Sequence, residues 1–128
     1  MPIHVELIKQ NRVVLQTYSD PLTNQDLIQL KNQMVNEILP AATGKLHVIA
    51  DLRDISNLPG TILNSGSSML RTPHANTGLV ICVTSNAFIN AMARILAKLV
   101  PKQPVKVMTS LEEAYKEVDA LLTSVVSE

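Results

Sequence analysis

The sequence predicts an α/β fold, a single mixed sheet with helices packed on it, in the order ββαβαβαβα. Short apolar runs rich in β-branched residues, which are typical of strands, alternate with segments whose apolar residues recur every three or four positions, which are typical of helices. The first two runs follow each other directly and predict a hairpin at one edge of the sheet. A chain of 128 residues is long enough for one domain, residues 1–128, with a sizeable core.

The N-terminal third predicts a hairpin followed by an amphipathic helix. Residues 3–8 and 12–18 are strand-length, and the three polar residues between them suit a tight turn. Thr23 and Asp26 resemble a capping box, which predicts that the first helix begins there. We expect this helix to end before Pro40, because proline cannot continue a regular helix.

The remaining elements follow the same alternation. We expect strands at 45–52, 78–85 and 105–108, and a second helix that starts near 58–61. The run at 78–85 is apolar without alternation, which predicts a strand covered on both faces. Ser85 is the expected cap of the third helix, and Ser110 with Glu113 predicts a second capping box at the start of the last helix.

Composition argues against several classes of partner and compartment. Eleven basic and eleven acidic residues cancel and aromatic residues make up only 2% of the chain, so we expect no nucleic-acid partner. The single cysteine, Cys82, allows no intrachain disulfide, and it sits in a predicted buried strand, where a small core residue is expected. No signal peptide and no integral membrane segment is evident, so we expect a cytoplasmic protein.

The sequence also offers no convincing catalytic or metal-binding set. Asp51 and Asp54 follow a predicted strand and could act as an acid/base pair, but Arg53 between them indicates neutralisation instead. The three histidines, at 4, 47 and 74, lack the short spacings of a zinc site. We therefore expect no metal, no cofactor and no enzymatic activity.

Arg94, Lys98 and Lys102 recur every four residues and form one face of the third helix. The simpler interpretation is a solvated face of an amphipathic helix, with Phe88 and Ile95 among the apolar residues on the opposite face. The alternative is a docking surface for an acidic partner or an anionic head group.

The stretch "VIADLRDISNLPGTIL" (48–63), together with the order of elements, resembles the STAS domain, the fold of SpoIIAA-like bacterial anti-sigma factor antagonists. The resemblance covers nearly the whole chain as topology but only this stretch as motif. It implies a regulatory protein-interaction module whose partner is an anti-sigma factor or a kinase-like protein. The partner-binding surface would be the second helix and the loop at 51–61, in which Asp51, Arg53, Asp54 and Ser56 are the candidate binding residues.

The resemblance also points to Thr61. In an ungapped alignment, residues 59–63 fall on the family's Asp-Ser-Ser-Gly-Leu motif, and Thr61 takes the place of the phosphorylatable serine. The sequence departs from the motif at Pro59, Gly60 and Ile62, which stand for Asp, Ser and Gly. The alternative is that Pro-Gly-Thr only makes a turn and a helix start.

A second functional class is a carrier of a small apolar or lipid-like ligand, because the STAS fold is similar to the lipid-binding Sec14-type domains. Met34, Met69, Met92 and Met108 are flexible side chains that could line an adaptable pocket, although methionines at such positions also serve as ordinary core. A homodimer through a sheet edge or the third helix is a further expectation.

Overall fold

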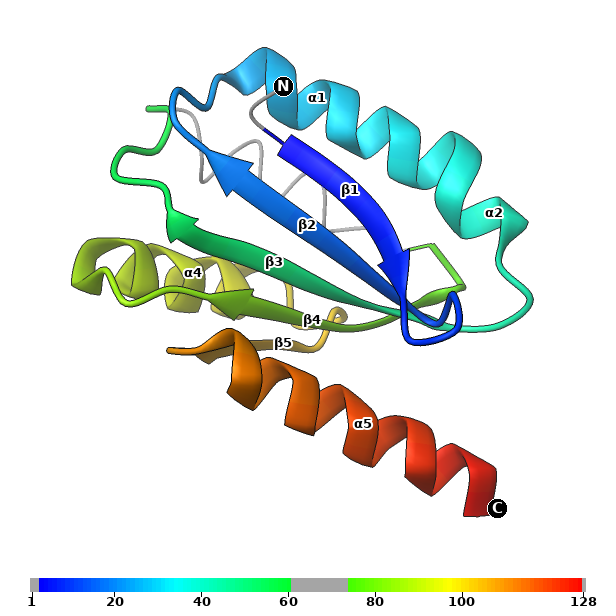
Figure 1. Cartoon of the computed structure of the whole chain (residues 1–128). Coiled ribbons are helices and arrows are strands. Elements are labelled where there is room, and N and C mark those ends of the chain that lie inside the picture. Colours follow the sequence, from blue (N-terminus) through cyan, green and yellow to red (C-terminus); the bar gives the residue numbers. More distant parts are fainter. Residues whose placement is uncertain (1–2, 61–73, 128) are drawn as a thin grey trace.

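The computed structural model describes residues 3–60 and 74–127, which contain a five-stranded sheet in the order β1-β2-β3-β4-β5 (Figure 1). The strands are β1 (Ile3–Ile8), β2 (Val13–Ser19), β3 (Leu46–Asp54), β4 (Thr77–Val83) and β5 (Val105–Met108). β1 pairs with β2 in antiparallel fashion, and the four strands from β2 to β5 are parallel. The predicted α/β class, mixed sheet and leading edge hairpin are therefore confirmed.

The helical elements lie on both faces of the sheet. They are α1 (Asn24–Gln33), η1 (Met34–Ile38), α2 (Leu39–Ala41), α4 (Ala87–Leu99) and α5 (Leu111–Ser127). From residue 61 on, the second helix expected from the sequence lies outside the described residues. None of the helices that the structure describes is long and apolar enough to cross a membrane.

The turn between β1 and β2 is tight and left-handed. Lys9, Gln10 and Asn11 have φ values of 54°, 60° and 63°, a region that costs non-glycine residues about 1–2 kcal/mol each. The turn is closed by the Arg12 amide, which donates to the Ile8 carbonyl over 3.2 Å. The chain thus accepts local strain in order to reverse between Ile8 and Val13.

The start of α1 agrees with the prediction, and its end does not. Thr23 Oγ1 accepts from the Asp26 amide at 3.2 Å, and Asp26 Oδ2 accepts from the Thr23 amide at 2.9 Å, which completes the capping box. The expected end before Pro40 is wrong, since helical backbone continues to Ala41. The segment just before Pro40 widens into the π-helix η1, in which the Leu39 amide donates to the Met34 carbonyl. A widened turn accommodates a proline, which lacks the N–H and crowds the carbonyl four residues earlier.

The cap of α4 is Asn86, one residue later than the predicted Ser85. Asn86 Oδ1 accepts from the amides of Phe88 and Ile89 at 2.9 and 3.2 Å. The predicted apolar face is only partly buried, because Ile89 is buried whereas Phe88 and Leu99 are 63% and 52% exposed.

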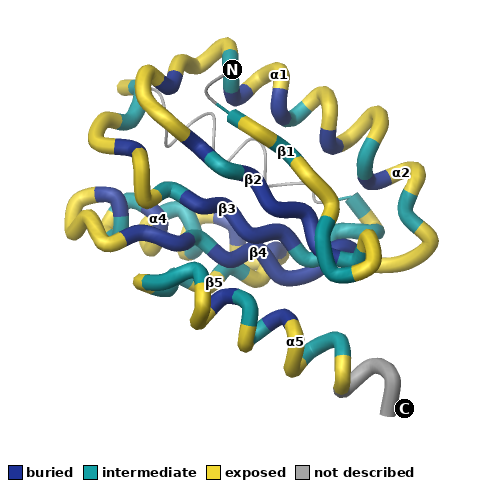
Figure 2. The backbone as a smooth tube through the Cα atoms, viewed as in Figure 1, coloured by how far each residue is buried: buried dark blue, intermediate teal, exposed yellow. Residues whose placement is uncertain are grey.

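Alternation along the strands divides the core into two parts. The central strands β2, β3 and β4 are buried along much of their length (Figure 2). The α5 face is the side of the sheet on which α5 packs, and its buried residues are Val13, Leu15, Ile49, Leu79, Ile81, Val83, Ala114 and Val118. The α1/α4 face is the opposite side, with Val14, Tyr18, Val48, Ala50 and Val80 from the strands, residues of α1, η1 and α2, and Ile89 of α4.

The start of α5 is held by Ser110, whose Oγ accepts from the Glu113 amide at 3.1 Å. The Glu113 carboxylate accepts from the hydroxyl of Thr109 at 3.3 Å. Ser110 thus caps the last helix as predicted, while the Glu113 carboxylate, expected to complete a capping box, binds the Thr109 side chain.

Candidate functional site: a cavity on the α1/α4 face

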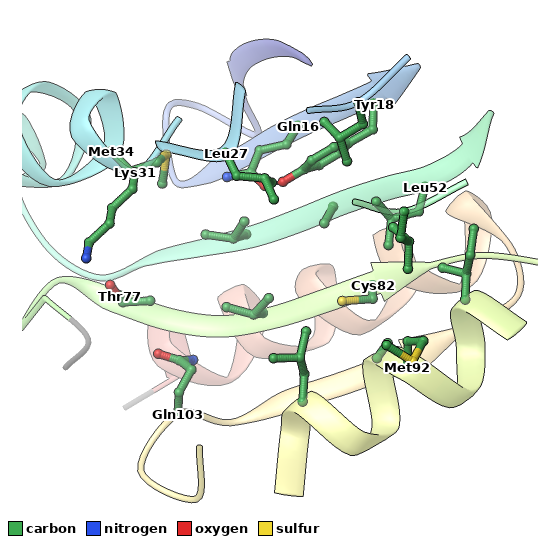
Figure 3. Close-up of a pocket in the computed structure, with 18 of the residues that line it drawn as sticks. Gln16, Tyr18, Leu27, Lys31, Met34, Leu52, Thr77, Cys82, Met92 and Gln103 are labelled. Atoms are coloured by element: carbon green, nitrogen blue, oxygen red, sulfur yellow. The ribbon is translucent and has the colours of Figure 1, made fainter. Parts of the chain in front are cut away.

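A cavity of about 280 Å³ lies between the α1/α4 face and the helices above it (Figure 3). Alternate residues of β2, β3 and β4 point into it, and this floor consists of Gln16, Tyr18, Val48, Ala50, Val80 and Cys82. The small side chain of Ala50 at the centre of the floor leaves room that a larger residue would fill. The cavity therefore arises from the choice of side chains on one face of a regular sheet.

The walls come from the two helical segments that flank this space. Leu27 of α1 and Met34 of η1 lie on one side, and Ile89 and Met92 of α4 lie on the other. Met34 and Met92 are thus placed as a pocket-lining role requires. Met108 packs on the α5 face instead, and Met69 lies outside the described residues.

Two polar side chains occupy the middle of this apolar space. The Tyr18 hydroxyl donates to Gln16 Oε1 at 2.9 Å, and both residues are nearly fully buried, at 6% and 5% exposure. Burial, with a smaller contribution from Cys82, raises the pKa of Tyr18 well above its ordinary value, so the phenol stays neutral. Gln16 takes part in the hydrogen bond with Tyr18 through its Oε1, so its amide group lies beside the Tyr18 hydroxyl on the floor of the cavity.

Cys82 lies on the same floor of the cavity, and its thiol is held in the neutral form. Burial raises the pKa of its thiol to about 11, because the thiolate would lose its hydration. The neutral thiol that persists at physiological pH is a poor nucleophile. Cys82 therefore serves as a small apolar side chain, as the sequence predicted.

The two ends of the cavity differ in polarity. The end near the amino termini of the parallel strands carries Lys31, His74, Thr77 and Gln103. The opposite end is apolar, with Leu22, Leu27, Leu52 and Leu58. In Figure 3, Lys31 and Thr77 lie at one side of the cavity, and Leu52 and Met92 lie at the other.

The charged and polar residues of the predicted partner-binding loop do not line this cavity, whereas Leu52 and Leu58 of the same segment do. Asp51 is 6% exposed and forms a bidentate ion pair with Arg53, with Nε–Oδ1 and Nη2–Oδ2 distances of 2.8 Å. The hydrogen bonds from Arg53 hold the pKa of Asp51 below its usual range. Asp54 is exposed at the end of β3. Arg53 thus neutralises Asp51, as the sequence indicated.

Ser56 is also held by an internal contact. Its amide donates to Asp20 Oδ2 at 3.1 Å, and its hydroxyl donates to the same carboxylate. These bonds lower the pKa of Asp20, the hydroxyl contact most of all. Thr61, the predicted phosphoacceptor, lies outside the described residues.

The basic side chains of α4 point away from the cavity. Arg94 and Lys98 are exposed, and so is Lys102 beyond the helix. Arg94 Nε donates to Asn90 Oδ1 at 2.7 Å, a bond between successive turns of the same helix. The cavity and this basic face are therefore separate features of α4.

The histidines have separate local roles. His47 Nδ1 accepts from the Leu79 amide at 3.0 Å, and burial lowers the pKa of this ring. His74 Nδ1 accepts from the Asn76 amide at 3.0 Å, and His4 is exposed on β1. Across residues 3–60 and 74–127, no three His, Cys, Asp or Glu side chains gather as metal ligands.

Sequence reasoning did not single out Gln16 and Tyr18. The signal was present, because Gln16 interrupts an otherwise apolar run and has the same parity in β2 as Val14 and Tyr18. A buried amide in a central strand needs a partner, which is reason enough to examine such a position.

The arrangement of strands and helices was compared with known proteins. An uncharacterised protein of the DUF3478 family with a SpoIIAA-like fold, from Shewanella loihica PV-4, superposes with a TM-score of 0.65. The superposition covers 89% of this chain and 90% of that chain, at 12% sequence identity. The fold is SpoIIAA-like. No protein-family model matches the sequence, and no curated protein matches it either.

Proposed function

We propose that this protein binds a small, largely apolar ligand in the cavity on the α1/α4 face. The observation that carries the proposal is the cavity itself, about 280 Å³ in volume and lined mainly by apolar side chains around the Gln16–Tyr18 pair. Its volume is near the lower end of the range of about 300–1,000 Å³ that ligand pockets occupy.

A cavity of this size is larger than the gaps that ordinary side-chain packing leaves in a protein interior. Protein interiors are packed at a density of about 0.75 and hold few voids larger than one water molecule. The Gln16–Tyr18 pair places polar groups within this apolar space. A guest that fills the space and bears one polar group would suit both features.

The proposed role is binding without catalysis. The two potential nucleophiles on the cavity floor, Tyr18 and Cys82, are both held in their neutral forms by burial. A catalytic nucleophile needs an adjacent base or a lowered pKa, and the shifts here run in the opposite direction.

Native mass spectrometry of protein purified from its own host tests the proposal. We expect an added mass under native conditions that disappears on denaturation. Ala50→Leu should remove this added mass by filling the centre of the cavity, while Ala120→Leu, on an exposed position of α5, should keep it. A bare protein that also fails to bind added dodecanol would contradict the proposal.

We propose a regulatory protein interaction in the cytoplasm as the second candidate function. It is supported by the SpoIIAA-like fold and by the exposed end of β3, where the Arg53 side chain is 45% exposed and Asp54 lies beside it. The partner would be a regulator such as an anti-sigma factor or a kinase-like protein. Phosphorylation of Thr61 would belong to the same function.

An affinity-capture experiment distinguishes this candidate. A regulator identified with the wild-type protein should be lost with Asp54→Arg and retained with Glu112→Arg, a charge reversal at an exposed position on α5. A regulator bound equally by both variants, or the capture of no regulator, would contradict the loop as the partner-binding surface. Phosphorylation of Thr61 is tested by the intact mass of the protein isolated from cells grown under several conditions. A mass increase equal to one phosphate group is the expected result.

A further inference from the structure

We propose that the outer side of α4 is a docking surface for an acidic amphipathic helix of another protein. A line of exposed apolar side chains and, beside it, a line of basic side chains make up this surface. None of these side chains lines the cavity, and none belongs to the end of β3. The proposal is therefore independent of both candidate functions.

The charges of the chain are unevenly distributed along its sequence. Between Asp54 and Glu112 there is no Asp or Glu, although basic residues continue through this interval. α4 lies within it and carries Arg94 and Lys98, and Lys102 follows shortly after the end of the helix. The chain is neutral overall, yet α4 is basic, and a local charge of one sign attracts a partner of the opposite sign.

The basic line is exposed and is not neutralised by the described part of the chain. None of the ion pairs formed among residues 3–60 and 74–127 involves Arg94, Lys98 or Lys102. The hydrogen bond from Arg94 Nε to Asn90 Oδ1, at 2.7 Å, orients the guanidinium along the helix and leaves its charge uncompensated, since an amide is neutral. Acidic side chains of a partner would supply the missing negative charge.

The apolar line consists of Phe88, Ile95 and Leu99, which are large and exposed. Residues seven and eleven positions apart lie on the same side of a helix. This side is not the one that holds α4 on the sheet, because Ile89, which packs in the core, lies elsewhere on the helix surface. Contiguous apolar side chains on a surface mark a site of interaction with a protein or a membrane.

The relative position of the two lines favours a partner helix. Lys98 follows Ile95 by three residues and is therefore its neighbour on the helix surface, while Arg94 lies one turn before Lys98. An amphipathic helix that packs its apolar residues on the first line can place Asp or Glu, four residues apart, against the second. A helix that lies in a membrane surface turns a broad apolar face to the lipid, whereas the broad apolar face of α4 packs on its own sheet.

Site-specific photocrosslinking in the native host tests the proposal. Benzoylphenylalanine replaces Phe88, an exposed aromatic position, and mass spectrometry identifies the crosslinked peptide. We expect a peptide of another protein that contains Asp or Glu and has apolar residues at helical spacing. The same photoreactive residue in place of Ala120, which is exposed on α5, should not crosslink to this peptide.

The crosslinked segment, made as a synthetic peptide, then measures the contribution of charge. Lys98→Glu should weaken its binding at least about tenfold, because an attraction becomes a repulsion. Lys116→Glu, the same charge reversal at an exposed position of α5, should change the affinity less than about twofold. Added salt should weaken binding to the wild-type protein, because it screens exposed charges.

The remaining outcomes would overturn the proposal. A crosslink to a second copy of this chain would indicate self-association. A crosslink to lipid, or sedimentation with phosphatidylglycerol vesicles that Lys98→Glu abolishes, would indicate membrane docking. A crosslinked peptide without acidic residues, an affinity that Lys98→Glu leaves unchanged, or no crosslink from position 88 would exclude an acidic helix as the occupant. Urea unfolding of each variant beforehand confirms that it is folded.

Discussion

The two faces of one sheet carry different kinds of core. On the α5 face, β-branched strand residues such as Ile49 and Ile81 pack to full burial against Ala114 and Val118. On the α1/α4 face, the same strands present Gln16, Tyr18, Ala50 and Cys82, and a cavity remains. The comparison shows that the α5 face is closely packed, whereas the α1/α4 face leaves a cavity between the sheet and its helices. Each strand contributes to both because its side chains alternate.

The largest expected difference between the faces is the response to truncation. Ile81→Ala should reduce the free energy of unfolding by about 2–5 kcal/mol, because Ile81 is fully buried in packed surroundings. Ile89→Ala should cost less, since Ile89 already borders the cavity and alanine favours the helix. Urea unfolding of the two variants measures both values, and equal losses would mean that the faces are packed alike.

The reactivity of Cys82 sharpens the comparison from the cavity side. A thiol pKa raised to about 11 leaves very little thiolate at pH 8, so an aromatic disulfide reagent should react at least tenfold more slowly than with the unfolded chain. The rate should rise as the pH approaches 11, and dodecanol bound in the cavity should lower it further. Because Cys82 is the only cysteine, the absorbance signal is unambiguous. A rate like that of the unfolded chain would show that the cavity does not shield the thiol.

Replacing a buried alanine with leucine on each face tests which face has space for a larger side chain. Ala114→Leu should destabilise the protein by about 1–3 kcal/mol, because Ala114 is fully buried against the strands of the α5 face. Ala50→Leu should change stability by less than about 1 kcal/mol, since the added atoms enter the cavity. Thermal unfolding gives both values. A larger loss for Ala50→Leu would mean that the cavity floor cannot accept another side chain.

The smallest expected effect concerns the polar pair. Tyr18→Phe should lower stability by about 0.5–1.5 kcal/mol, because it removes the hydroxyl that donates to Gln16 Oε1. Tyr115→Phe, on α5, should change stability by less than about 0.5 kcal/mol, as is usual away from buried polar contacts. Equal effects in chemical unfolding would indicate that the Tyr18–Gln16 bond contributes little.

Local sequence signals predicted the elements well, and the site hardly at all. The capping box of Thr23 and Asp26 involves residues three apart, so a short stretch of sequence contains the whole interaction. The cavity depends on how Ala50 and Cys82, on neighbouring strands, face side chains from two helices. In a strand covered on both faces, the residues that point to either face are apolar. The sequence therefore does not reveal on which face of the sheet a cavity remains.

Two errors have equally local causes. Ser85 and Asn86 are both good caps, and only the backbone decides which side chain reaches the free amides of α4. Pro40 normally marks the end of a helix, but η1 allows the helical backbone to continue through Pro40 to Ala41. The resemblance to the STAS domain predicted the fold correctly. Of the site residues that it implied, Asp51, Arg53 and Ser56 form internal contacts, Asp54 is exposed and Thr61 lies outside the described residues.

The strand order β1-β2-β3-β4-β5 has a consequence for how the protein is made. Each strand pairs with the one that precedes it in the chain, so the sheet can grow by addition at one edge as the polypeptide leaves the ribosome. The α5 face, with its row of isoleucine and valine side chains, stays uncovered until α5 follows β5. A nascent chain that stops after β5 would therefore present a flat apolar surface to chaperones, and the docking of α5 is the step that completes a protected fold.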